Sequence, residues 1–168
     1  MKRVFKYKGK DTVTQLAQTL TQIAGDNPVY FCVGSELSVI DSLGPKIGTR
    51  LKELSNGKLI VYGIKGAAIT ACNVQKAYRA VKHIHPTSKI IVIDAALGDN
   101  TGTIRVNNGG VCPGSGVGKN LGKIGDEGII CSFKRRHCSC FADSELLMRD
   151  ESRDENDIFI TPQTFKNT

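Results

Sequence analysis

The sequence contains no tryptophan, and its aromatic residues amount to only 6%. Proteins that bind single-stranded nucleic acids stack bases on aromatic side chains, so this composition does not favour that class. The longest aliphatic run is Ile90-Ile91-Val92-Ile93, whereas a membrane-spanning helix needs about 20 apolar residues. We therefore expect no membrane partner.

The features of an exported protein are also missing. Basic residues open the chain, but the apolar segment of a secretory signal does not follow them. The six cysteines are scattered, and Cys32 lies within an apolar run, which is typical of a buried free thiol. Without an export signal we expect reduced cysteines and a cytoplasmic location.

The remaining composition is that of a globular protein: 168 residues, 40% hydrophobic and 23% charged, enough for one domain with a sizeable core. The formal net charge is +7 but is unevenly spread, because residues 143–168 carry three basic and seven acidic side chains. A basic body raises the question of a nucleic-acid partner. Since the basic residues are dispersed and aromatic platforms are few, we do not expect one. Salt-dependent retention on DNA would support that alternative.

Helix-like and strand-like hydrophobic patterns alternate along the chain. Amphipathic spacing predicts helices over residues 11–24, 42–54 and 71–84. Short apolar runs predict strands over residues 29–33, 59–62, 90–93, 102–106 and 128–131, with a glycine-rich loop over 107–126. Apolar strands separated by helices indicate the α/β class: a three-layer α/β/α sandwich with a mostly parallel sheet.

The pattern changes after Phe133, where Lys134-Arg135-Arg136 begins a polar and then acidic segment. We predict an α/β domain over residues 1–133 and a divergent tail over residues 134–168. The tail includes His137-Cys138-Ser139-Cys140, but no second cysteine pair of matching spacing exists. A zinc site is therefore not expected.

Several polar residues fall where predicted strands end, and sites in open α/β sheets form outside the carboxyl ends of the strands. Glu36 and Asp41 follow the first strand, Lys65 follows the second, and Asp94 ends the third. Two carboxylates in one cleft can divide into a proton donor and a base. Two structural alternatives remain: Asp41 as a helix N-cap, and Asp94 as an acceptor for loop amides.

The segment from Cys112 to Asn120 looks like a phosphate-binding loop, but it departs from the Walker pattern at both ends. Pro113 occupies the position of the first glycine, and Asn120 that of the magnesium-binding serine or threonine. We expect the loop to present backbone N–H groups to a substrate carbonyl or carboxylate instead. No cofactor is expected.

These motifs resemble a known family. The segments are Cys32-Val33-Gly34-Ser35-Glu36, Asp41-Ser42-Leu43-Gly44-Pro45, Ile93-Asp94-Ala95-Ala96-Leu97-Gly98 and Pro113-Gly114-Ser115-Gly116-Val117-Gly118-Lys119. In this order they are similar to the small sporulation proteins of the YyaC type and, more distantly, to the germination protease of spore-forming bacteria. The resemblance covers about residues 28–130.

The resemblance implies a fold shared with the hydrogenase-maturation endopeptidases. It also implies a catalytic pair, because the aspartates regarded as catalytic in germination protease match Asp41 and Asp94. That enzyme cleaves the small acid-soluble proteins that coat spore DNA. The hydrogenase-type relatives hold nickel with Glu, Asp and His; Ser42 stands at the Glu position and no His is evident, so we expect no metal. Cys112 replaces a histidine of germination protease.

We therefore expect a spore-associated, aspartate-dependent peptidase that acts on small proteins or peptides. Its substrate-binding residues would be Glu36, Lys65, Gly114, Ser115 and Gly116. The alternative is a non-catalytic sporulation protein that uses the same fold as a binding module. A homo-oligomer is left open.

The tail departs from these relatives, which continue past the last predicted strand into another apolar strand and helix. We hypothesise that residues 134–168 are divergent or arise from a reading-frame change near residues 131–134. The nucleotide sequence tests this, because a frame change requires an alternative frame that encodes the missing apolar strand and helix.

Overall fold

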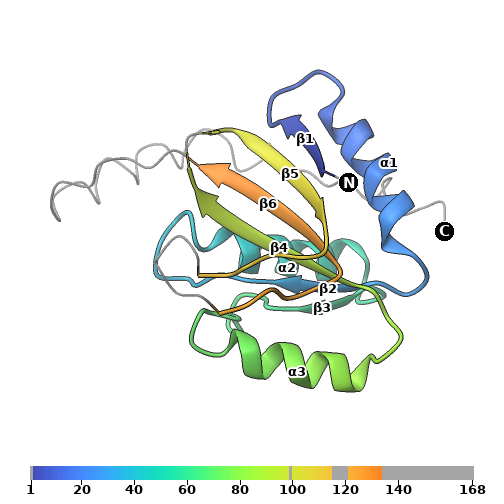
Figure 1. The fold of residues 1–168 in the computed structure, drawn as a ribbon, viewed down its shortest axis with the longest axis vertical. Helices are drawn as coiled ribbons and strands as arrows, with labels where there is room; N and C mark the ends of the chain where they lie inside the picture. Colours follow the sequence, from blue (N-terminus) through green and yellow to red (C-terminus); the bar gives the residue numbers. More distant parts are fainter. Residues whose placement is uncertain (1, 99, 115–120, 134–168) are drawn as a thin grey trace, which may run out of the picture.

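The computed structural model describes residues 2–98, 100–114 and 121–133, and its elements follow the order β-α-β-α-β-α-β-β-β (Figure 1). The helices are α1 (Thr12–Ala24), α2 (Leu43–Leu54) and α3 (Val74–Ile84). The strands are β1 (Lys2–Lys6), β2 (Val29–Cys32), β3 (Ile60–Tyr62), β4 (Ile90–Leu97), β5 (Thr103–Asn108) and β6 (Glu127–Phe133). The α/β class predicted from the sequence is confirmed.

The six strands form one sheet in the order β1-β5-β6-β4-β2-β3. The pairs β2–β3, β2–β4 and β4–β6 are parallel, whereas β5 pairs antiparallel with both β6 and β1. The parallel part therefore places the carboxyl ends of β2, β3, β4 and β6 at one edge of the sheet, where sites are expected in this architecture.

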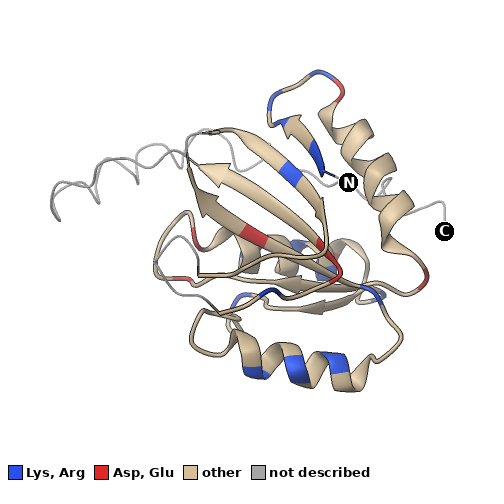
Figure 2. Ribbon diagram, in the orientation of Figure 1, with Lys and Arg blue, Asp and Glu red and all other residues tan. Residues whose placement is uncertain are grey.

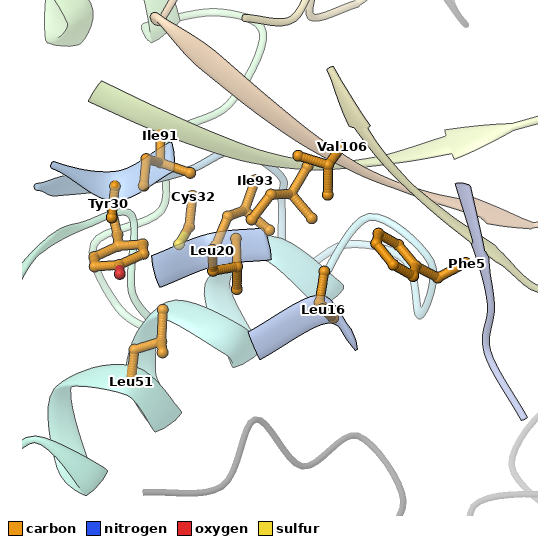
Figure 3. Packing of buried hydrophobic residues seen from close by; sticks show 11 residues of the cluster. Phe5, Leu16, Leu20, Tyr30, Cys32, Leu51, Ile91, Ile93 and Val106 are labelled. Atoms are coloured by element: carbon orange, nitrogen blue, oxygen red, sulfur yellow. The ribbon is translucent and has the colours of Figure 1, made fainter. Parts of the chain in front are cut away.

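Helices cover both faces of the sheet. On one face α1 and α2 contribute Leu16, Leu20 and Leu51 to a cluster with Cys32 and Ile93 of the strands (Figure 3). On the other face α3 contributes Val74 and Val81, which pack with alternate strand residues such as Phe31 and Val92. Because successive strand residues point to opposite faces, the central strands need apolar residues at every position. This explains the continuous apolar runs of β2 and the first half of β4.

The first strand was not predicted. β1 runs antiparallel to β5 at the edge of the sheet, and of its five residues only Phe5 is buried. Lysine and arginine side chains on an edge strand are typical, because they discourage pairing with other chains. Because these charged residues interrupt the apolar pattern, hydrophobic periodicity did not indicate a strand here.

The predicted end of β4 is also wrong. The strand continues past Ile93 to Leu97 because β6 pairs with it in register from Ile91↔Glu127 to Leu97↔Phe133. Asp94 thus lies within β4 rather than after it. The predicted strand over 128–131 likewise extends to residues 127–133.

The described part of the chain contains no helix with the length and apolar character of a membrane span. The predicted tail over residues 134–168 lies outside the described residues, so its separation from the α/β domain stays a prediction.

Candidate functional site

A cavity of about 530 Å³ lies at the carboxyl ends of β2 and β4 and brings both predicted aspartates together. Its volume is within the range of ligand sites in proteins, about 300–1,000 Å³. The lining consists of the residues Val33, Gly34, Ser38, Ile40, Asp41, Ala71, Asp94, Ala95, Ala96, Leu97, Arg105, Val111, Cys112, Pro113, Gly114 and Ile130. The cavity is therefore mostly apolar, with a few ionisable groups.

Asp94 reaches this cavity because the neighbouring strands have different lengths. β2 is paired with β4 only as far as Cys32↔Ile93, so the next residue of β4, Asp94, stands where β2 has ended. On its other side Asp94 is still paired with Ile130 of β6. The side chain is thereby fixed by a rigid strand and half-buried.

The environment of Asp94 favours its protonated form. The pKa of Asp94 is raised from 3.8 to about 7, mainly by burial and to a smaller extent by the negative charge of Asp41. The hydrogen bond from the Ala95 amide to Oδ1, at 2.9 Å, acts in the opposite direction. Burial dominates because it removes water from the charged form. A carboxyl group that titrates near neutral pH can donate or accept a proton under physiological conditions.

Asp41 is held by a compact loop between β2 and α2. Its backbone N–H donates to Ser38 Oγ at 3.2 Å, and its carbonyl accepts from the Ser35 amide at 3.1 Å. Gly34 is essential to this loop: its φ is +152°, and a Cβ atom there would lie 2.0 Å from the carbonyl oxygen of Asp41. The glycine after β2 thus lets the loop fold back and present Asp41 to the cavity.

The two structural alternatives for the aspartates find no support. α2 begins at Leu43 with Ser42 as its N-cap residue, and no side-chain capping hydrogen bond is present. Asp94 Oδ1 accepts from the next residue of its own strand, Ala95, and within residues 2–98, 100–114 and 121–133 no loop amide donates to it.

The remaining predicted site residues do not all lie in this cavity. Gly114 lines the cavity with Asp41 and Asp94, whereas Ser115 and Gly116 lie outside the described residues. Glu36 and Lys65 line a neighbouring cavity of about 280 Å³. Ser38 belongs to both linings, so the two cavities adjoin.

Glu36 has a definite structural contact in this second cavity. Its Oε1 accepts a hydrogen bond from the backbone N–H of Gly66 at 2.8 Å. Glu36 therefore ties the loop after β2 to the loop after β3. The backbone N–H of Lys65 donates to Thr49 Oγ1 of α2 at 2.9 Å, which anchors the same loop from the other side.

Two lining residues with ionisable side chains were not predicted as site residues from the sequence: Arg105 and Cys112. Arg105 lies in β5 between Ile104 and Val106, and this charged residue within an apolar strand was the available signal. Cys112 is an exposed free cysteine in the segment that enters the glycine-rich loop. The buried Cys32 differs from it, because burial raises the pKa of that thiol to about 12.

The described residues contain no group of three or more His, Cys, Asp or Glu side chains arranged to hold a metal ion. Figure 2 shows lysine and arginine positions spread over strands, helices and loops, and Arg105 is the one basic residue among the described residues that line the cavity. The cavity is instead defined by two carboxyl groups and one guanidinium.

Comparisons with known proteins agree with the YyaC-type part of the resemblance in the sequence motifs. A family model described as "Protein of unknown function (DUF1256)" matches residues 4–145. The uncharacterized protein YyaC of Bacillus subtilis (strain 168) is 33% identical over 119 residues, which make up 70% of this chain and 58% of that protein. The match thus spans little more than half of that relative's length. No solved structure matches the chain. The family match covers most of the sequence, and the chain therefore belongs to the DUF1256 family.

Proposed function

We propose that this protein is an aspartate-dependent peptidase that hydrolyses small proteins or peptides, with Asp41 and Asp94 as its catalytic pair. One observation carries the proposal: the two aspartates, from separate segments of the chain, line the same cavity, and Asp94 has a pKa of about 7. Two carboxyl groups in different protonation states are what acid–base hydrolysis of an amide requires.

The reaction assigns a different role to each carboxyl group. The Asp41 carboxylate takes a proton from a water molecule as the water oxygen forms a bond to the peptide carbonyl carbon. The Asp94 carboxyl group, which retains its proton up to about pH 7, gives that proton to the amide nitrogen as the C–N bond breaks. The products are a carboxylic acid and an amine, and proton exchange with water restores the pair.

The loop that follows β5 supplies the groups nearest to the substrate backbone. Gly114 lines the cavity with a φ of +77°, a conformation that favours glycine, and without a Cβ atom its backbone can be approached closely by a bound chain. We propose that Gly114, together with Ser115 and Gly116, binds the peptide or its oxyanion. Because Glu36 and Lys65 line the adjoining cavity, they would contact a more distant part of the substrate.

The motifs that resemble germination protease and the hydrogenase-maturation endopeptidases support this proposal. They also suggest the type of fold and the cellular location. We propose a three-layer sandwich of that protease type, acting in the cytoplasm of a sporulating cell or in the spore. Small spore proteins are the first substrates to test. The packing of α1 and α2 on one sheet face and α3 on the other is consistent with this fold.

The test is to assay cleavage of small spore proteins and unfolded peptides by the purified chain and by Asp41→Asn and Asp94→Asn. We expect each variant to lose at least about 100-fold in rate, as is typical when a general acid or base is removed. Asp26→Asn is the matched control, since Asp26 is exposed and outside the cavity. Full cleavage by either pair variant would exclude the aspartate mechanism.

The second candidate is a non-catalytic binding module for another protein. The observation in its favour is the exposure of Leu37, at 96%, and Val39, at 50%, because apolar side chains around a cavity mark many protein-binding surfaces. No cleavage of any tested protein, combined with retention of a spore protein that is lost in Leu37→Ser, would favour this candidate.

A further inference from the structure

Arg105 and Asp94 stand in one row across the sheet. Each is paired with Ile130 of β6, Arg105 from the β5 side and Asp94 from the β4 side. Paired residues on neighbouring strands project to the same face, and strands lie about 4.8 Å apart, so the two Cα atoms are about 10 Å apart. Both side chains line the large cavity, with Ile130 between them.

One nitrogen of the Arg105 guanidinium, Nε, lacks a hydrogen-bond partner within the described structure. This nitrogen is also buried. The ion pairs among the described residues lie elsewhere, between Arg50 and Glu53 and between Lys82 and Asp126. A buried polar group without a partner is costly, which marks a position where a ligand can supply the missing acceptor.

We propose that Arg105 binds the C-terminal carboxylate of the peptide whose scissile bond lies at the aspartate pair. A carboxylate fits a guanidinium because its two oxygens can accept from Nε and one Nη together. The distance of about 10 Å corresponds to about three extended residues. The protein would thus remove short segments from the carboxyl end of a chain. This inference rests on the proposed peptidase function for its substrate class and deepens it.

The shape of the lining favours a chain end over a continuing chain. Arg105 is the single lining residue contributed by β5, and among the described residues none comes from β1, the next strand of the sheet. A peptide that extends from Asp94 across Ile130 therefore reaches the guanidinium at the border of the cavity. The floor between the two ends is apolar, which suits small apolar side chains next to the terminal carboxylate.

Binding of three tripeptide probes tests this inference independently of cleavage. The probes are acetyl-Ala-Ala-Ala with a free carboxylate, its C-terminal amide, and acetyl-Ala-Glu-Ala amide. They are titrated into the full chain carrying Asp41→Asn, so that no probe is cut. We expect the free acid to bind at least about tenfold more tightly than the amide, as for a charge-assisted hydrogen bond. Arg105→Gln should reduce its affinity to that of the amide, and the exposed Arg79→Gln should not.

A second measurement keeps the test valid if Arg105→Gln does not fold. In the chain with Arg105 intact, the free acid should slow alkylation of Cys112, which lines the cavity, but not of Cys72, which is exposed outside it. Equal effects of acid and amide, or no effect of either, would overturn the inference. A preference for the glutamate-containing amide would show that Arg105 recognises an internal acidic side chain instead of a chain end.

The experiments distinguish failure of the proposed peptidase mechanism from failure of the proposed carboxylate site at Arg105. If Asp41→Asn and Asp94→Asn cleave normally while the free acid still binds through Arg105, the peptidase mechanism is wrong and the carboxylate site stands. If cleavage depends on the aspartates but the carboxylate makes no difference to binding, only the role of Arg105 is lost.

Discussion

The negative charge of Asp41 acts on Asp94 across a shared cavity, although burial is the larger cause of the rise in the pKa of Asp94 to about 7. One residue comes from a loop that folds back on Gly34, the other from the interior of a strand. The two carboxyl groups are therefore placed by separate parts of the fold, the loop before α2 and the strand β4.

The proposed peptidase activity should fall above about pH 7, because Asp94 would then lose the proton that the leaving amine needs. The measurement is kcat as a function of pH on a peptide without ionisable side chains. We expect the alkaline limb to have an apparent pKa near the value of about 7 for Asp94. A kcat that does not change as the pH rises through about 7 would contradict the role of Asp94 as the acid.

Asp94 should also make folding stability depend on pH. The folded protein binds its proton up to about pH 7, whereas the carboxyl group of the unfolded chain releases it near 3.8, so stability falls as the pH rises between these values. Asp94→Asn removes this penalty. We expect the substitution to raise the free energy of unfolding by about 2–4 kcal/mol more at about pH 8 than at about pH 4. Denaturant unfolding at both pH values measures the difference, and an equal effect at both would contradict the prediction.

Gly34→Ala should disrupt the loop that carries Asp41. A Cβ atom at this position would lie 2.0 Å from the carbonyl oxygen of Asp41, and the φ of +152° is strained for alanine. We expect a loss of about 3 kcal/mol or more in unfolding free energy together with loss of cleavage. Gly57→Ala is the matched control: its φ is +73° but no atom lies within 4 Å, so we expect a loss of only about 1 kcal/mol. Equal losses in the two variants would show that the contact with Asp41 is unimportant.

Alkylation of Cys112 should block the cavity. Cys112 is exposed and lines it, whereas Cys32 is fully buried and its pKa of about 12 keeps it as an unreactive thiol. We expect iodoacetamide to modify Cys112, and cleavage to decrease in proportion to the modified fraction found by mass spectrometry. Cys112→Ser should retain activity and resist the reagent. Inhibition that persists in this variant would place the sensitive thiol elsewhere.

The sequence predicts the parts of the fold that depend on local periodicity. The three helices lie where the amphipathic spacing places them, and the apolar runs of β2 and β4 match strands that are buried on both faces. Edge and partner-dependent features are different. β1 carries charges because it borders solvent, and β4 extends to Leu97 only because β6 pairs with it. Such pairing involves residues far apart in sequence, which no local pattern records.

The candidate site was likewise predictable only where its residues follow from the local sequence pattern. Asp41 and Asp94 could be found because both follow apolar strand segments, and the structure places them in one cavity. Glu36 and Lys65 were expected with them but line the adjoining cavity, since Glu36 instead holds the amide of Gly66. Arg105 was missed because its place beside the aspartates depends on the register of β5 and β6. That register is set by the tertiary fold.

The position of β6 has a consequence for how the protein is made. β6 is the last strand of the described chain in sequence, yet it lies between β5 and β4 in the sheet. During synthesis the β1–β5 pair and the β4–β2–β3 group have no shared hydrogen bonds until residues 127–133 leave the ribosome. The row from Asp94 to Arg105 is completed only at that moment. A nascent chain stalled before Glu127 would hold both halves of its sheet without the cavity floor that joins them.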